Sequence, residues 1–111
     1  MEKVQQQVFD YMVEDDRYLN IDFSLTPLAD EMNMSLSELE MEYQKISGEP
    51  LNSLLTRMRL KHACDLLENT DKKLEVIAQE SGFGSSRTFF RQFKSEYNMT
   101  PNVYRQLSKT E

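Results

Sequence analysis

The segment from Pro50 to Glu68 constrains the fold more than any other part of the chain, because its apolar face changes sides. When the segment is projected as a helix, at about 100° per residue, its apolar residues form two groups on opposite sides. The first group is Leu51, Leu54, Leu55 and Met58, and the second is Leu60, Ala63, Cys64 and Leu67. A helix that packs on one core keeps one apolar stripe. We therefore expect a long linker helix over residues 50–68 that is shared by two small cores.

The rest of the chain is also predicted to be helical. No stretch alternates apolar and polar residues over the length of a strand, and only three Gly and three Pro interrupt the chain. A chain of 111 residues has the size of one ordinary domain, or of two very small units that share a core. The sequence thus predicts an all-α protein of about seven helices, with an N-terminal subdomain over residues 1–49, the linker helix, and a C-terminal subdomain over residues 69–111.

The predicted N-terminal subdomain ends in a short helix, a tight turn and a longer helix. The first helix of the chain is expected over residues 3–15, and Thr26 followed by proline is expected to cap the short helix. Asn33 suits a left-handed turn, and the pair Ser35 and Glu38 is spaced as a capping box for the longer helix, which Gly48 ends. This layout predicts a helix-turn-helix.

The same layout recurs in the C-terminal subdomain, where Gly82 follows a short helix and a longer helix is expected from Ser85 to Tyr97. Its four aromatic residues fall on one face, which we expect to be buried: Phe89, Phe90, Phe93 and Tyr97. A cationic stripe lies on the opposite face, with two polar side chains beside it: Arg87, Arg91 and Lys94, with Ser86 and Thr88. The second helix of a helix-turn-helix is the one that enters the major groove of DNA, and arginine there can bind guanine or phosphate.

The formal net charge of −6 hides a difference between the two halves of the chain. Residues 1–50 contain twelve Asp and Glu against three Lys and Arg, whereas residues 51–111 contain seven against ten. The net negative charge of the whole chain argues against a nucleic-acid partner, but the C-terminal half alone has an excess of Lys and Arg. Contact with phosphate is therefore expected in the C-terminal half.

In these motifs the sequence resembles the DNA-binding domain of the AraC family of bacterial transcription regulators. The resemblance is close over Met58–Arg105, in RMRLKHACDLLENT, VIAQESGF, FFRQFK and TPNVYR, and looser in LADEM and SLSEL. It implies two helix-turn-helix units joined by a long helix, with two recognition helices in successive major grooves. It places Ser86, Arg87 and Arg91 at base edges in the second unit, and Ser37, Glu40 and Met41 in the first. The set of expected DNA-binding residues is completed by Thr88, Lys94 and Gln44.

The first recognition helix departs from the family's pattern, which often has basic or amide side chains there. It contains Glu38, Glu40 and Glu42, and Lys45 is its one cation. Carboxylates can accept a hydrogen bond from cytosine, but they repel phosphate. We therefore expect DNA to be read chiefly through the second recognition helix.

Two other classes of function stay open as alternatives. The acidic N-terminal half is also compatible with a helical protein-interaction module that binds a basic partner. An enzyme is disfavoured, because His62 and Cys64 are single residues of their kinds and no nucleophile and base can be paired. We expect no cofactor, no metal and no membrane contact, and a cytoplasmic location. The partners expected are double-stranded DNA, RNA polymerase, and a sensor or dimerisation domain outside this chain.

Overall fold

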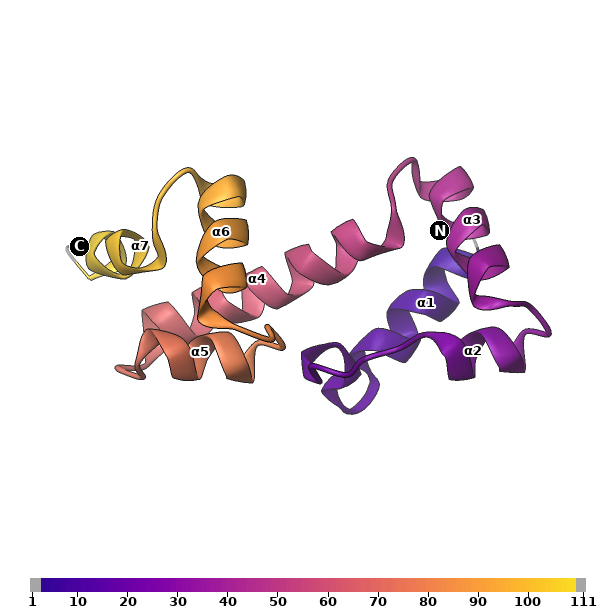
Figure 1. Cartoon of the computed structure of the whole chain (residues 1–111), viewed down its shortest axis with the longest axis horizontal. Helices are drawn as coiled ribbons and strands as arrows, with labels where there is room; N and C mark the ends of the chain where they lie inside the picture. Colours follow the sequence, from indigo (N-terminus) through magenta and orange to yellow (C-terminus); the bar gives the residue numbers. More distant parts are fainter. Residues whose placement is uncertain (1–2, 110–111) are drawn as a thin grey trace.

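The computed structural model describes residues 3–109, which form seven α-helices and one short 3₁₀ helix (Figure 1). The elements are α1 (Lys3–Val13), η1 (Glu14–Leu19), α2 (Thr26–Glu31), α3 (Leu36–Ser47), α4 (Leu51–Asn69), α5 (Leu74–Glu80), α6 (Ser86–Tyr97) and α7 (Pro101–Ser108). The molecule is elongated, with extents of 48 × 24 × 23 Å. The prediction of an all-α fold, with two helix-turn-helix units joined by one long helix, is confirmed.

Helix α4 serves two cores, as its change of apolar face predicts. Leu51 is buried in an N-terminal core with residues of α1, α2 and α3, and Leu54, Leu55 and Met58 pack against the same core. Four later residues are buried in a C-terminal core with α5 and α6: Leu60, Ala63, Cys64 and Leu67. Figure 1 shows the helix running diagonally from one bundle to the other. Each bundle is therefore completed by one end of the same helix.

The N-terminal bundle differs from the sequence prediction at two helix ends. The first helix ends at Val13 rather than residue 15, because Asp15 and Asp16 adopt left-handed conformations with φ of 52° and 53° within η1. Aspartate tolerates this conformation better than most residues. The sequence predicts Thr26 as the N-cap of α2. In the structure it is instead the first helical residue, and its N–H donates to Ser24 Oγ at 3.1 Å.

The turns of the two helix-turn-helix units have the same hydrogen bonds. Asn33 and Gly82 both adopt the left-handed conformation, with φ of 58° and 91°. The next residue in each turn donates its N–H five residues back, from Met34 to the carbonyl of Ala29 and from Phe83 to that of Ala78, both at 2.9 Å. This bond closes a helix end in a Schellman-type turn. The two units therefore repeat one backbone design.

The two longer helices also begin and end alike. Ser35 caps α3 through the predicted capping box, accepting from the Glu38 N–H at 3.1 Å while its own N–H donates to the Glu38 carboxylate at 2.9 Å. Ser85 caps α6 by accepting from the Thr88 N–H at 3.1 Å. Each helix has twelve residues and ends at a left-handed residue, glycine after α3 and asparagine after α6.

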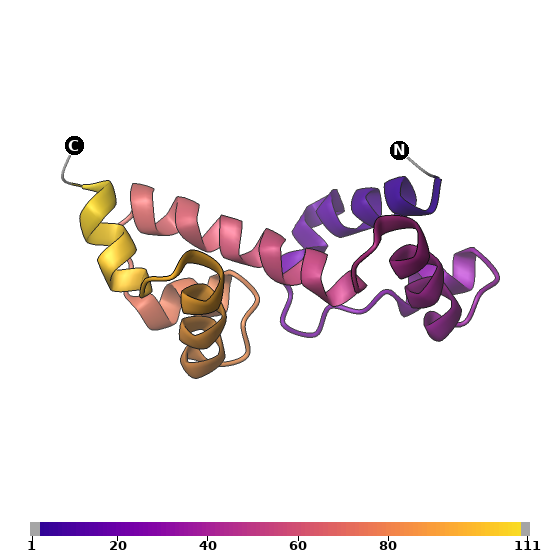
Figure 2. The same cartoon turned by 90° about the horizontal axis from the view of Figure 1, so that it is seen from above.

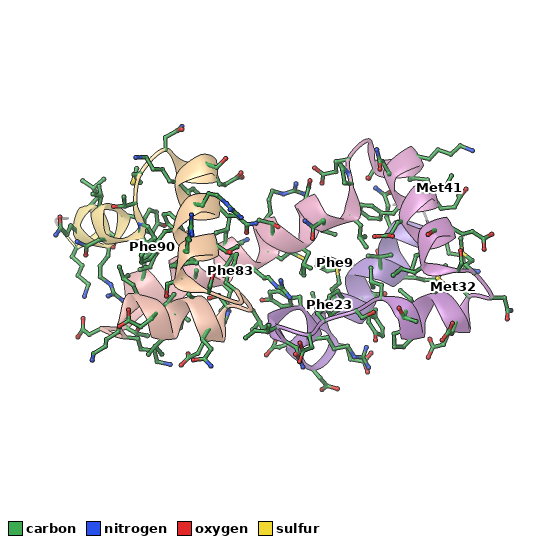
Figure 3. All side chains as sticks on the ribbon, viewed as in Figure 1. Phe9, Phe23, Met32, Met41, Phe83 and Phe90 are labelled. Carbon is green, nitrogen blue, oxygen red and sulfur yellow. The ribbon has the colours of Figure 1, made fainter. Side chains whose placement is uncertain are left out.

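The aromatic face of α6 packs as predicted, with one exception. Phe89 and Phe93 are fully buried in the C-terminal core, and Tyr97 packs at its edge. Phe90, expected to be buried, is 40% exposed (Figure 3). Phe90 lies about 100° around the helix from Phe89, which places it at the margin of the core. The centroids of the two rings are 5.7 Å apart.

Candidate nucleic-acid interface

Helices α3 and α6 are presented on the same side of the molecule. They run roughly parallel to each other in Figure 1, and the second view shows both nearly end-on along one long side (Figure 2). Helix α1 lies toward the opposite side in that view, and α4 runs obliquely from that side toward α3. Two recognition helices with this arrangement can enter successive major grooves from one face of a duplex.

The cationic stripe predicted on α6 is exposed. Arg87, Arg91 and Lys94 are all exposed, and none of their side chains makes a hydrogen bond or ion pair with another residue of the described range 3–109. Ser86 and Thr88, also predicted to bind DNA, are partly buried at the start of the helix, where the N–H of Thr88 forms the cap. The three cationic side chains are therefore available to a partner.

The equivalent stripe on α3 is uncharged. The two helices begin at Leu36 and Ser86, so residues 50 apart occupy equivalent positions. The equivalents of the three cationic residues are Ser37, Met41 and Gln44. All three are exposed, and Met41, with 71% of its surface accessible, is the most exposed large apolar residue of the described range (Figure 3). The structure thus brings these three predicted residues together on one outer face.

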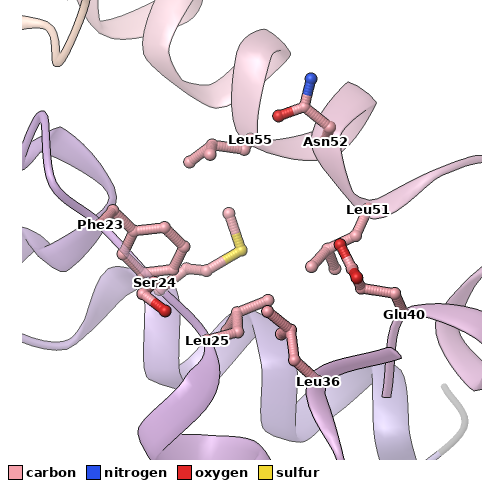
Figure 4. A pocket seen from close by; sticks show the side chains of 9 residues that line it. Phe23, Ser24, Leu25, Leu36, Glu40, Leu51, Asn52 and Leu55 are labelled. Carbon is pink, nitrogen blue, oxygen red and sulfur yellow. The ribbon is translucent and has the colours of Figure 1, made fainter. Parts of the chain in front are cut away.

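The acidic side chains of α3 lie beside this face rather than on it. Glu38 closes the capping box, and its hydrogen bonds with Ser35 hold the pKa of its carboxyl below the usual value. Glu42 is partly buried. Glu40 occupies the position equivalent to Phe90 and lines a cavity of about 190 Å³ between α3 and α4. Figure 4 shows its side chain beside Leu51 at that cavity. Of the first unit's predicted residues, Glu40 is thus the one set apart from the outer stripe.

Arg59 is a residue that sequence reasoning missed. It lies on α4 and its guanidinium donates to two carbonyl groups of the N-terminal unit, from Nε to Tyr18 at 2.7 Å and from Nη2 to Asn20 at 2.8 Å. Burial lowers the pKa of this arginine. No sequence pattern reveals a contact across about forty residues with main-chain oxygens. The one available signal was Arg59 lying off both apolar faces of the linker helix.

Cys64 and the metal-ligating side chains are the remaining candidates for chemistry in the described range. Within residues 3–109, no three His, Cys, Asp or Glu side chains are grouped so that they could hold a metal ion. Cys64 is buried, and burial raises the pKa of its thiol, which disfavours the reactive thiolate. None of the helices over that range is both long and apolar enough to span a membrane.

Comparison with known proteins agrees with this architecture. A family model described as a helix-turn-helix domain matches residues 28–107, which is more than half of the chain. The fold matches a transcriptional regulator from Chromobacterium violaceum described as containing an AraC-type DNA-binding domain, with a TM-score of 0.76 and 22% identity over 96% of this chain and 95% of that one. The chain belongs to the AraC-type helix-turn-helix family.

Relatives of this AraC-type domain include an uncharacterised transcriptional regulator from Staphylococcus aureus strain COL. It is 32% identical over 99 residues, which cover 89% of this chain and 13% of the relative. The fold also matches the DNA-binding domain of AdpA, solved in complex with a target DNA, with a TM-score of 0.77 and 22% identity over 96% of this chain and 93% of that one. The resemblance drawn from the sequence motifs is confirmed, and these matches give no support to the alternative of a protein-interaction module. The AraC-type domain is a DNA-binding domain of the transcription-regulator class.

Proposed function

We propose that this domain binds double-stranded DNA with α6 in one major groove and α3 in the next. The observation that carries the proposal is the exposure, on one side of the molecule, of two equivalent helices whose outer side chains make no hydrogen bond or ion pair within residues 3–109. Successive grooves on one face of DNA are about 34 Å apart, and the molecule is 48 Å long, so both helices can be accommodated.

Helix α6 supplies most of the attraction to DNA in this proposal. Arg91 lies at the middle of the outer stripe, where a guanidinium can donate two hydrogen bonds to one guanine. Arg87 and Lys94 flank it and can contact bases or phosphates, while Ser86 and Thr88 lie at the helix start. Phosphate contacts fix the orientation of the protein, and base contacts give the sequence preference.

Helix α3 contributes base contacts with little electrostatic attraction. The exposed Met41 presents an apolar side chain that suits the methyl group of thymine, and the amide of Gln44 suits adenine. Ser37 can bond to either kind of base. The first unit is therefore proposed to favour A·T pairs, whereas Glu40 lies outside this stripe and is not assigned a base.

The wider assignment follows from the same proposal. The domain acts by binding rather than catalysis, needs no cofactor, and works in the cytoplasm where bacterial DNA is found. It spans 13% of the length of the first S. aureus relative. RNA polymerase and a sensor or dimerisation domain are therefore proposed as further partners of the complete regulator.

The test is the salt dependence of binding to a duplex selected from a random pool. Each phosphate contact contributes a slope of about −0.9 to the plot of log affinity against log salt concentration. Replacing Arg87, Arg91 and Lys94 by Ala together should make the slope shallower by roughly 0.9 for each side chain that contacts phosphate. Lys61→Ala, on α4, is the matched loss of a cation outside the stripe and should leave the slope unchanged. Absence of duplex binding by the parent domain would refute the proposal.

A further inference from the structure

The two units are joined by a second connection besides α4. Arg59, on α4, holds the end of η1 through its bonds to the carbonyl groups of Tyr18 and Asn20. The Tyr18 ring also packs edge to face against the ring of His62, which lies about one turn after Arg59 on α4, with the ring centroids 6.5 Å apart. The segment after α1 is therefore fixed to the middle of the helix that the two units share.

The same segment touches the turn of the second helix-turn-helix. Gly82, in that turn, lies close both to this segment and to Arg59 on α4. A Cβ atom on Gly82 would be 3.1 Å from the carbonyl oxygen of Leu19 and 2.6 Å from Arg59 Nε. Ile21 and Ser86, the first residue of α6, line one cavity of about 200 Å³. The guanidinium of Arg59 thus lies where the N-terminal unit, the linker helix and the second turn meet.

This junction has a mechanical consequence. Two bundles joined only by one helix can change their relative angle by bending or twisting that helix. A second contact away from the helix axis removes that freedom, because both bundles must then move together. Arg59 supplies two of the hydrogen bonds that hold this contact, and its planar guanidinium presents several donors in a fixed geometry.

We propose that Arg59 is a positioning residue that fixes the angle between α3 and α6 and so sets the number of base pairs between the two half-sites. The proposal rests on the proposed function, because it requires both helices to contact DNA. It does not require Arg59 itself to touch DNA. Its signature is a loss of spacing discrimination, which a residue that only stabilised the fold would not control.

The experiment compares a selected duplex with versions carrying one base pair added or removed between the half-sites. One base pair displaces a half-site by about 3.4 Å and rotates it by about 34°. The parent domain, being rigid, should lose about tenfold or more in affinity on the altered duplexes. Arg59→Met keeps the aliphatic stem but removes the donors, so its loss should fall to about threefold or less, with weaker binding to the original duplex.

Two further variants separate the possible outcomes. Arg57→Met is the matched control, because Arg57 lies on the same helix but pairs with Glu49 at 2.7 Å instead of with η1, and it should keep the parent's spacing penalty. Arg59→Lys, with a single ammonium group, should give an intermediate penalty. Circular dichroism verifies that each variant is folded.

The outcomes also distinguish this proposal from the proposed function. A folded Arg59→Met variant that keeps the full spacing penalty overturns the positioning role and leaves docking of both units intact. A parent domain that binds tightly but ignores spacing shows that only one unit contacts DNA, and overturns both. If Arg59→Met is unfolded, the penalty of Arg59→Lys decides, since a value equal to the parent's also overturns the role.

Discussion

The two helix-turn-helix units share their backbone design and differ in what they expose. Their recognition helices have the same length, a serine cap at the start and a left-handed residue at the end. Leu39 and Phe89 are equivalent and both fully buried, and Tyr43 and Phe93 form a second equivalent pair of core residues. On the outer face, by contrast, a neutral stripe in the first unit replaces the cationic stripe of the second.

This difference shows which positions the fold constrains. Caps, turns and core residues must satisfy hydrogen bonds or fill space, and a change there costs stability whatever the unit binds. The side chains at the three outer positions of each helix are exposed and make no hydrogen bond or ion pair within the described range, so they can vary without unfolding the unit. Equivalent backbones can therefore have unequal roles on DNA, one supplying charge and the other supplying neutral contacts with bases.

The largest expected effect concerns a core position of the second unit. Phe93→Ala should lower the free energy of unfolding by about 3–5 kcal/mol, because it removes a fully buried ring that contacts Phe89, Tyr97 and Tyr104. Phe90→Ala, on the same helix but 40% exposed, is the matched control and should cost about 1 kcal/mol. Chemical denaturation followed by circular dichroism measures both. Equal costs would contradict the assignment of Phe93, but not Phe90, to the core.

A smaller effect is expected at the outer stripes, where Arg91 and Met41 are equivalent. Arg91→Ala should weaken binding to a selected duplex by about 1–3 kcal/mol and relax preference at one or two base pairs. Met41→Ala should change base preference in the other half-site while leaving the salt slope unaltered, since it removes no charge. Binding titrations at several salt concentrations measure both. The contrast between units fails if Met41→Ala also makes the slope shallower, or if folded Arg91→Ala binds as the parent does.

Local signals made most of the fold predictable from sequence. The capping box at Ser35, the left-handed residues Asn33 and Gly82, and the switched apolar face of the linker helix each depend on residues close together in the chain. The end of the first helix at Val13 was not predictable in this way. It depends on two consecutive aspartates turning left-handed, and on carbonyl groups beyond them that Arg59 binds.

The candidate site was predictable only in part. The charge and periodicity of α6 located its outer stripe, because residues on one helix are related by simple geometry. On α3, counting acids suggested a repulsive surface, although the capping-box spacing already assigned Glu38 to a cap, and the structure adds that Glu40 lines a cavity. Side chains with local partners cannot be recognised from charge alone. The contact made by Arg59 depends on tertiary structure, so it could not be found by this reasoning.

The smallest effect is expected for Glu40→Gln, which tests whether Glu40 contacts a base. Glu40 is equivalent to the flanking residue Phe90, and its carboxylate lies at the cavity beside α4 rather than on the outer stripe. Its remaining influence on DNA is then repulsion of phosphate across solvent. Removing that charge should tighten binding by roughly 0.3–1 kcal/mol, decreasing as salt screens it.

The decisive comparison for Glu40→Gln uses a selected duplex and a scrambled one. Repulsion from phosphates does not depend on base sequence, so the gain in affinity should be the same on both duplexes. Asp65→Asn, an exposed acid on α4, is the matched control and should have less effect on either. If Glu40→Gln instead weakens binding to the selected duplex alone, the carboxylate accepts a hydrogen bond from a base, cytosine being the one with the suitable donor. The first unit would then also read DNA with a charged side chain. The two units would differ in the sign of the charge that they present to the bases, and not in whether they present a charge.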